Sequence, residues 1–180
     1  VVRRLQRVCR FYGRDPQVIG TSATIANPQE LGGTLIGREP VLVADNGAPS
    51  GPRHILLYNP PILDELLGIR RAALADARHI TNLLLDLDLQ TVVFCASRGA
   101  VEQMLVELRQ DALYAGRNPA TVRGYRGGYL DSERREIESG LRSAQVRCVV
   151  ATSALELGVD IGGMAAAVLV GYPGSVASTW

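Results

Sequence analysis

The chain has 180 residues, of which 47% are hydrophobic, and its formal net charge at pH 7 is only +1. This apolar content supports a packed core and excludes an extended disordered chain, while the near-neutral charge excludes a protein whose whole surface is basic enough to attract nucleic acid. All 19 cationic side chains are arginines, so the chain contains no lysine. The G-x-x-x-x-G-K-[ST] phosphate-binding loop is therefore excluded, because its lysine must reach the β- and γ-phosphates.

The sequence has no apolar run of membrane-spanning length and no signal-like start, so we expect no membrane contact. Cys9, Cys95 and Cys148 show no C-x-x-C spacing, and the last two lie within apolar, strand-like runs. We expect buried, reduced thiols, no metal site and a cytoplasmic protein. His54 and His79 stand alone, which favours structural histidines over ligands or catalytic bases.

The first part of the chain predicts short elements separated by glycine and proline. In order, these are a basic helix over 1–12, a buried strand over 17–21, a helix from 28 to about 35, and a strand over 40–44. Asn27 suits the N-cap of the second helix and Pro28 its first turn. Because residues 59–68 are typical of a linker or an exposed excursion, we expect two domains, 1–60 and 61–180.

From residue 69 onward, helices and strands alternate regularly. The predicted elements are a long helix over 69–87, a strand over 91–95, a helix over 97–110, a strand over 121–125, a helix over 132–141 capped by Asp131 or Ser132, and strands over 146–152 and 165–170. This order predicts an α/β domain with a parallel sheet and right-handed crossovers. Ligands of such open sheets bind at the carboxyl ends of the strands.

Five segments in a fixed order resemble a known family. They are T-S-A-T-I-A-N-P at 21–28, V-V-F-C-A-S-R at 92–98, Y-R-G-G-Y at 125–129, A-T-S-A-L-E-L-G-V-D-I-G at 151–162 and G-Y-P-G-S-V-A-S-T-W at 171–180. These resemble motifs III, IV, IVa and V, and the approach to motif VI, of superfamily-two DEAD/DEAH-box helicases. Over nearly the whole chain, the closest resemblance is to bacterial DNA-repair helicases of the MrfA/YprA type.

The resemblance implies a RecA-like parallel sheet flanked by helices, as in the P-loop NTPase helicase core. The chain would hold the C-terminal end of a first RecA-like domain and most of a second. We expect it to be an internal fragment, with the P-loop and acidic metal motif before residue 1 and the arginine finger of motif VI after Trp180. The fragment by itself is then expected to be inactive.

The resemblance also implies roles for motif residues. Ser22 and Thr24 would couple the γ-phosphate site to domain closure, although such a pair can equally complete strand hydrogen bonds. Gly158 and Asp160 would face the nucleotide, and the alternative for Asp160 is a cap on a local turn. The implied nucleic-acid contacts are Ser97, Arg98, Tyr125, Arg126, Gly127, Thr152 and Ser153.

Simpler structural roles compete with these nucleic-acid contacts. Ser97 and Arg98 equally fit a helix cap with a surface arginine, and Tyr125 fits a packing residue better than a base-stacking one. Arg126 and Gly127 also fit an ordinary glycine-rich turn.

The implied function is an ATP-dependent DNA helicase or translocase that moves on single-stranded DNA in DNA repair. ATP and Mg²⁺ would be held together with residues outside the chain, and zinc only in a further C-terminal region. Single-stranded or partly duplex DNA is the expected partner, with a nuclease or another repair protein as a candidate. The alternatives are a non-catalytic nucleic-acid-binding module, an RNA helicase and a Rossmann-like small-molecule enzyme, the last of which lacks its G-x-G-x-x-G loop.

Overall fold

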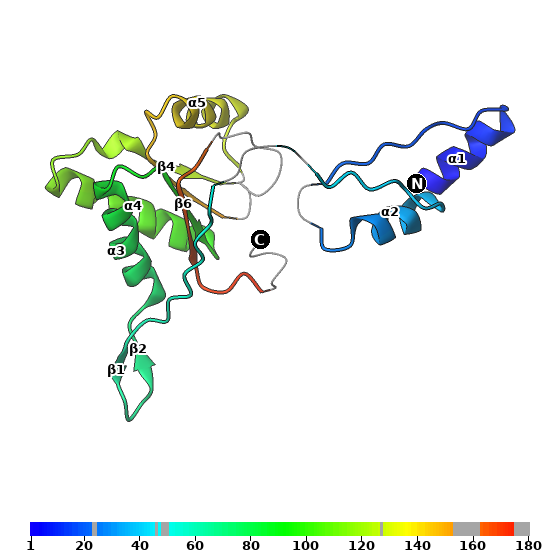
Figure 1. The fold of residues 1–180 in the computed structure, drawn as a ribbon. Helices are drawn as coiled ribbons and strands as arrows, with labels where there is room; N and C mark the ends of the chain where they lie inside the picture. Colours follow the sequence, from blue (N-terminus) through cyan, green and yellow to red (C-terminus); the bar gives the residue numbers. More distant parts are fainter. Residues whose placement is uncertain (23–24, 46, 48–50, 127, 153–162, 175–180) are drawn as a thin grey trace. The chain divides into compact units, whose positions relative to one another are not determined.

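The computed structural model describes residues 1–22, 25–45, 47, 51–126, 128–152 and 163–174 (Figure 1). The chain divides into two compact units, one built on Val1–Leu56 and the other on Leu57–Ser175. No helix in the described part of the chain is both long and apolar enough to cross a membrane. The assignment of the predicted domains 1–60 and 61–180 to two RecA-like domains stays a prediction.

The first unit contains two helices, α1 (Val2–Phe11) and α2 (Pro28–Ile36). They are joined by Arg3, whose guanidinium donates to the carbonyl oxygen of Thr34. Asn27 occupies the predicted N-cap position of α2, but its side-chain amide donates to Glu30 Oε2 (2.9 Å) and caps no backbone group. The helix ends at Gly37, which has the left-handed conformation (φ 75°) that glycine adopts without steric cost.

The strands predicted over 17–21 and 40–44 are wrong, because neither segment has regular secondary structure. Their apolar composition is typical of buried strands, yet Ile19, Val41 and Val43 are exposed. A strand exists only when a neighbour accepts and donates its backbone hydrogen bonds. No described residue of the first unit supplies that neighbour.

The second unit begins with an antiparallel hairpin of β1 (Ile62–Asp64) and β2 (Ile69–Arg70), which projects from the rest of the unit (Figure 1). The Asp64 carboxylate accepts from the backbone N–H of Leu67 (3.0 Å) and tightens the turn. This segment was expected to be a linker or an exposed excursion. The long helix therefore starts later than predicted, as α3 (Ala73–Asp86).

The core of the second unit is a four-stranded parallel sheet in the order β4-β5-β3-β6. Its strands are β3 (Thr91–Cys95), β4 (Val122–Tyr125), β5 (Cys148–Ala151) and β6 (Ala166–Val170). They alternate with the helices α3, α4 (Arg98–Tyr114) and α5 (Asp131–Arg142), and the 3₁₀ turn η1 (Pro119–Thr121) precedes β4. The predicted α/β class with a parallel sheet is confirmed.

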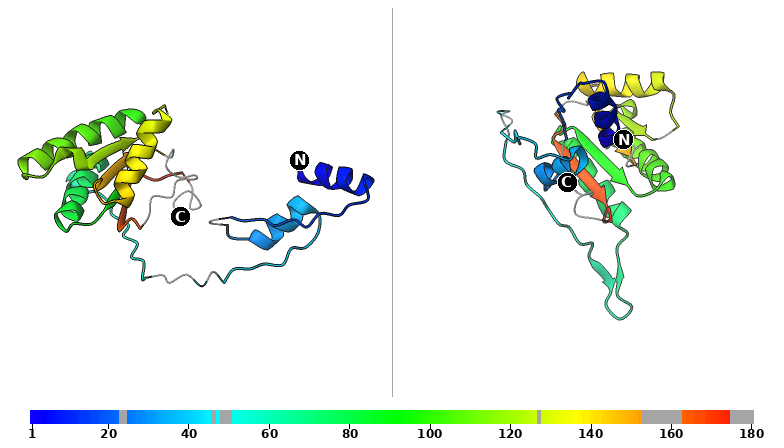
Figure 2. Two further views of the ribbon diagram at one scale, coloured as in Figure 1. Left: turned by 90° about the horizontal axis from the view of Figure 1, so that it is seen from above. Right: turned by 90° about the vertical axis from the view of Figure 1, so that its right-hand side faces the viewer.

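Helices cover the two faces of this sheet, with α3 and α4 on one face and α5 on the other (Figures 1 and 2). Along β3, Val93 contacts the cluster formed with α3 and α4, while Val92 contacts the cluster formed with α5. The central strands β3 and β5 are runs of mostly apolar residues, as expected for strands whose two faces are both covered. Each fully buried side chain such as Met104 or Leu108 contributes roughly 1.5–3 kcal/mol of hydrophobic free energy.

The cap of α5 differs from the predicted one, and one core position of α3 is polar. The N-cap of α5 is Leu130, whose backbone N–H donates to Glu133 Oε2 (3.1 Å), so neither Asp131 nor Ser132 is the cap. On α3 the fully buried position is Thr81, a polar residue. Its hydroxyl donates to the carbonyl oxygen of Ala77 (2.7 Å), and this bond satisfies the polar group inside the core.

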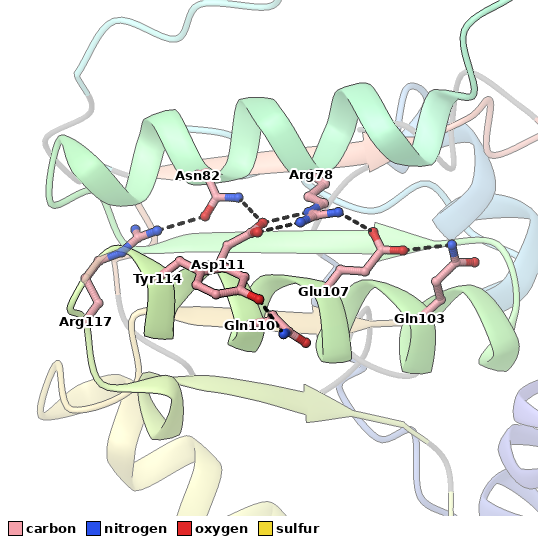
Figure 3. A network of polar contacts seen from close by, with 8 residues as sticks. All are labelled: Arg78, Asn82, Gln103, Glu107, Gln110, Asp111, Tyr114 and Arg117. Atoms are coloured by element: carbon pink, nitrogen blue, oxygen red, sulfur yellow. Dashed lines mark hydrogen bonds and ion pairs between the residues drawn. The ribbon is translucent and has the colours of Figure 1, made fainter.

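A network of polar side chains fixes α3 against α4 (Figure 3). Asp111 of α4 accepts from Arg78 Nε (2.6 Å) and from Asn82 Nδ2 (2.6 Å), both on α3. Arg78 also contacts Glu107 (3.3 Å), and Arg117 donates to Asn82 Oδ1 (2.8 Å). The hydrogen bond from Arg78 is the main reason that the pKa of the Asp111 carboxyl lies below its usual value. The network thereby sets the position of α4, whose first turn lies at the carboxyl edge of the sheet.

Replacing Asp111 with Asn should lower the free energy of unfolding by about 1–2 kcal/mol at pH 7, because a charge-assisted pair is lost at a partly exposed site. The lowered pKa of Asp111 stabilises the fold above the ordinary carboxyl range, and this contribution disappears as the pH falls below about 4. Urea unfolding between pH 7 and 3 should therefore show the difference between D111N and the parent chain shrinking. As the control, E107Q should cost less, and a difference independent of pH would contradict this explanation.

Candidate nucleic-acid interface at the strand ends

The parallel register brings three chain segments to one edge of the sheet. Ala151, the last residue of β5, is paired with Phe94 of β3 on one side and with Tyr125 of β4 on the other. The next residues are Ala96 after β3, Arg126 after β4 and Thr152 after β5, so the three following segments leave the sheet at the same edge. This is the edge at which open parallel sheets bind ligands.

Ser97 is the N-cap of α4, and its side-chain oxygen accepts from the backbone N–H of Ala100 (3.2 Å). The capping alternative therefore holds for this residue. Arg98 opens the helix with an exposed side chain and forms no ion pair with any residue that the structure describes. The remaining N–H groups of this first turn, next to an unpaired guanidinium, suit a phosphate oxygen.

Tyr125 is buried, with 3% of its surface exposed, and packs with Ile137 and Leu141 of α5. Its hydroxyl donates to Glu138 Oε1 (3.1 Å). Burial, followed by the neighbouring carboxylate, raises the pKa of the phenol above its usual value. The covered ring thus fits the packing alternative and not base stacking, and a contact of this segment with a single strand stays a prediction.

Arg126 follows directly after β4 and contacts two side chains. Its Nε lies 3.1 Å from Glu102 Oε1 of α4, as an ion pair without hydrogen-bond geometry. Its guanidinium carbon lies 5.5 Å from the centre of the Tyr129 ring, which is a cation–π distance. The side chain keeps 36% of its surface exposed, so a ligand can still reach it.

Sequence reasoning missed the two residues that hold Arg126. Glu102 lies four positions after Arg98 on the same helix, and such spacing predicts an i,i+4 ion pair between those two. The structure instead pairs Glu102 with Arg126, 24 positions further along the chain. Tyr129 is the last residue of the Y-R-G-G-Y segment, and only the contact with Arg126 distinguishes it from an ordinary turn residue.

Of the other predicted site residues, Thr152 follows β5 at the same edge and is partly buried. Ser22 is exposed and belongs to the first unit. The remaining predicted residues lie outside the described part of the chain: Thr24, Gly127, Ser153, Gly158 and Asp160.

Cys95 of β3 and Cys148 of β5 have thiols of low reactivity. Burial raises the pKa of Cys95 to about 11 and is the main cause that raises the pKa of Cys148 to about 12. Both thiols are therefore protonated at neutral pH and poorly suited to bind a metal or to act as nucleophiles.

The chain is similar to known helicases over its whole length. The family model described as the helicase conserved C-terminal domain matches residues 76–180. The uncharacterized ATP-dependent helicase YprA of Bacillus subtilis is 54% identical over 180 residues, which is 100% of this chain and 24% of that protein. This chain thus spans about a quarter of the length of that relative.

Solved structures agree with this similarity. The DUF1998 helicase MrfA bound to DNA is 53% identical, with a TM-score of 0.90, over 99% of this chain and 24% of that chain. The helicase Lhr of Mycobacterium smegmatis bound to single-stranded DNA and AMP-PNP is 28% identical, with a TM-score of 0.69, over 92% of this chain and 22% of that one. The parallel sheet flanked by helices is that of RecA-like helicase domains.

Replacing Tyr125 with Phe should lower the free energy of unfolding by about 1 kcal/mol, because the bond to the Glu138 carboxylate is lost while the packed ring stays. The raised pKa means that the neutral phenol stabilises the fold below pH about 10, and that this contribution is lost as the pH rises further. Absorbance titration of the phenols should accordingly lose its highest-titrating group in Y125F. Y172F, at an exposed tyrosine, is the control, and equal stability of the two variants would contradict the buried bond.

Proposed function

Because the chain belongs to the family of the helicase conserved C-terminal domain, we propose that it is part of an ATP-dependent DNA helicase or translocase. The intact protein would couple ATP hydrolysis to movement along single-stranded DNA. The observation that carries the proposal is the pair of cationic groups, Arg98 and Arg126, that follow strands β3 and β4 at one edge of the sheet. Charged groups at such an edge can bind successive phosphates of a strand.

Contacts at this edge would be made to the nucleic-acid backbone. Arg98 and Arg126 supply charge, the capped first turn of α4 supplies N–H groups, and Thr152 and Ser153 supply small hydroxyl groups. Because such contacts read phosphates and not base edges, we expect little sequence preference. The Lhr structure with single-stranded DNA supports this choice of ligand.

ATP would bind between two RecA-like domains, to which we assign residues 1–60 and 61–180. Gly158 and Asp160 would face the nucleotide, and Ser22 and Thr24 would transmit closure of the cleft to the strand-binding edge. ATP with Mg²⁺ supplies the energy-yielding phosphoryl transfer, which in this class of enzyme relies on positioned cationic side chains. The AMP-PNP in the Lhr structure supports ATP as the nucleotide.

The cellular process, the location and the partner that we propose follow from the MrfA/YprA resemblance. We assign the intact protein to DNA repair in the cytoplasm, with a nuclease or another repair protein as its partner. Zinc would bind, if anywhere, in a region C-terminal to residue 180.

A non-catalytic nucleic-acid-binding module is the second candidate for this chain. The observation that favours it is the absence of lysine, which removes the usual cationic contact to the β- and γ-phosphates. A module of this kind would bind a strand without hydrolysing ATP. RNA is the alternative ligand, since backbone contacts alone distinguish it poorly from DNA.

Replacing Arg98 with Ala should weaken binding of the chain to a fluorescent oligothymidine strand about threefold to tenfold. The slope of log affinity against log salt should become shallower by about 0.7, because one phosphate contact is lost. Fluorescence anisotropy from 20 to 200 mM NaCl measures both quantities. The control R142A also removes one arginine, but at the end of α5, in the segment that leads into the start of β5. It should change neither the affinity nor the salt slope. Equal losses in R98A and R142A would argue against a site at the carboxyl edge.

The 180-residue chain should show no Mg²⁺-dependent ATPase activity above background, with or without single-stranded DNA. The physical reason is that no lysine is present to stabilise the charge that develops on the transferred phosphoryl group. Phosphate release by the purified chain is the measurement, with an intact helicase of the family as the positive control. Strand-stimulated hydrolysis by the chain alone would contradict the assignment.

A further inference from the structure

We infer that Glu102 and Tyr129 are positioning residues that hold the guanidinium of Arg126 ready for a nucleic-acid phosphate. The inference rests on the proposed function, because it takes Arg126 as a phosphate contact. It adds two residues, on α4 and after β4, whose roles neither the motifs nor their spacing indicates.

Glu102 contacts Arg126 from the side. Its Oε1 lies 3.1 Å from Nε, the inner nitrogen of the guanidinium, and both of these atoms are shielded from solvent. An ion pair whose facing atoms are desolvated is stronger than one between fully solvated atoms. The pair therefore restricts the side chain, although 36% of Arg126 and 46% of Glu102 remain exposed.

Tyr129 contacts the guanidinium at 5.5 Å, and its own ring is fixed. A side chain at Gly124 would place its Cβ 3.0 Å from the Tyr129 hydroxyl and 3.1 Å from Leu105 Cδ2. Glycine at this position of β4 therefore makes room for the tyrosine between the strand and α4. With its hydroxyl end seated there, the ring offers a stable surface to Arg126.

The two contacts leave the outer part of the guanidinium available. The terminal amino groups of Arg126 donate no hydrogen bond to any residue that the structure describes. These are the groups that bind a phosphate in a bidentate manner. Because the rotamers of Arg126 are already restricted, less side-chain entropy is lost when a phosphate binds.

Glu102 also acts against binding, because its negative charge repels a phosphate. That repulsion is screened at a half-exposed carboxylate. Immobilising a free arginine is one of the larger entropic costs of binding, so we expect positioning to exceed repulsion. Gln at position 102 keeps a side chain of the same shape against Nε but removes the full negative charge, so E102Q reduces the repulsion and also weakens the attraction to Arg126.

The test measures oligothymidine binding by fluorescence anisotropy for the parent chain and the variants R126A, E102A, E102Q and Y129L. R126A should weaken binding about tenfold, while E102A and Y129L should weaken it roughly threefold to tenfold. E102Q should bind between E102A and the parent chain, because the neutral side chain still covers Nε but attracts it less than the carboxylate does. E136A is the matched control, because Glu136 of α5 forms a comparable 3.1 Å ion pair with Arg123 of the same strand and should leave binding unchanged.

A second measurement needs no ligand. In the chain labelled with ¹⁵N-arginine, the Nε–H resonance of Arg126, assigned by its loss in R126A, should be resolved and slow to exchange with water. It should join the exposed arginines in E102A and stay resolved in E102Q. Thermal unfolding of every variant checks that the fold is retained.

The outcomes separate the inference from the proposed function. Tighter binding by both E102A and E102Q would make Glu102 a competitor of the phosphate and overturn the inference alone. An unchanged Arg126 resonance and unchanged binding in E102A would overturn it as well. Parent-like binding by R126A would overturn the phosphate contact and the inference together, and a parent chain without salt-dependent strand binding would overturn the proposed function itself.

Discussion

Every feature of the candidate site depends on the backbone ladder of β5 with its two neighbours. Ala151 is paired with Phe94 on one side and Tyr125 on the other, so three strands end at the same level. A one-residue slip would turn every side chain of a strand to the opposite face and would lose the packing of Val150 in the cluster with α3 and α4 and of Val149 in the cluster with α5. The apolar packing on both faces therefore fixes the edge at which the arginines lie.

The helices packed on the sheet determine where the side chains of the site lie. The network around Asp111 fixes α4 against α3, and α4 supplies the capped first turn with Arg98 and, one turn later, Glu102. On the other face, Gly140 of α5 faces Val146, where an added Cβ would lie 2.6 Å from a methyl carbon. Close packing at α5 and polar contacts at α4 thus place the carboxyl edge between two fixed layers.

The described cationic groups at this edge are held in different ways. Arg98 has no ion-pair partner among the described residues, whereas Arg126 lies between a carboxylate and an aromatic ring. The proposed movement along a strand requires both binding and release, and we expect a mixture of restricted and unrestricted arginines to suit moderate affinity. Tyr125, which the motif places in the same group, instead belongs to the core and supports the strand from which Arg126 emerges.

The sequence by itself determined the α/β class, the order of α3 to β6 and the motif segments at the strand ends, because periodicity and composition are local properties. It predicted strands at 17–21 and 40–44 wrongly, since a strand depends on a partner that local composition does not reveal. Only the tertiary structure decided that Tyr125 is buried and that Glu102 pairs with Arg126 and not with Arg98. Both outcomes depend on how α4, α5 and β4 pack, and contacts between distant segments arise from packing, which no local pattern encodes.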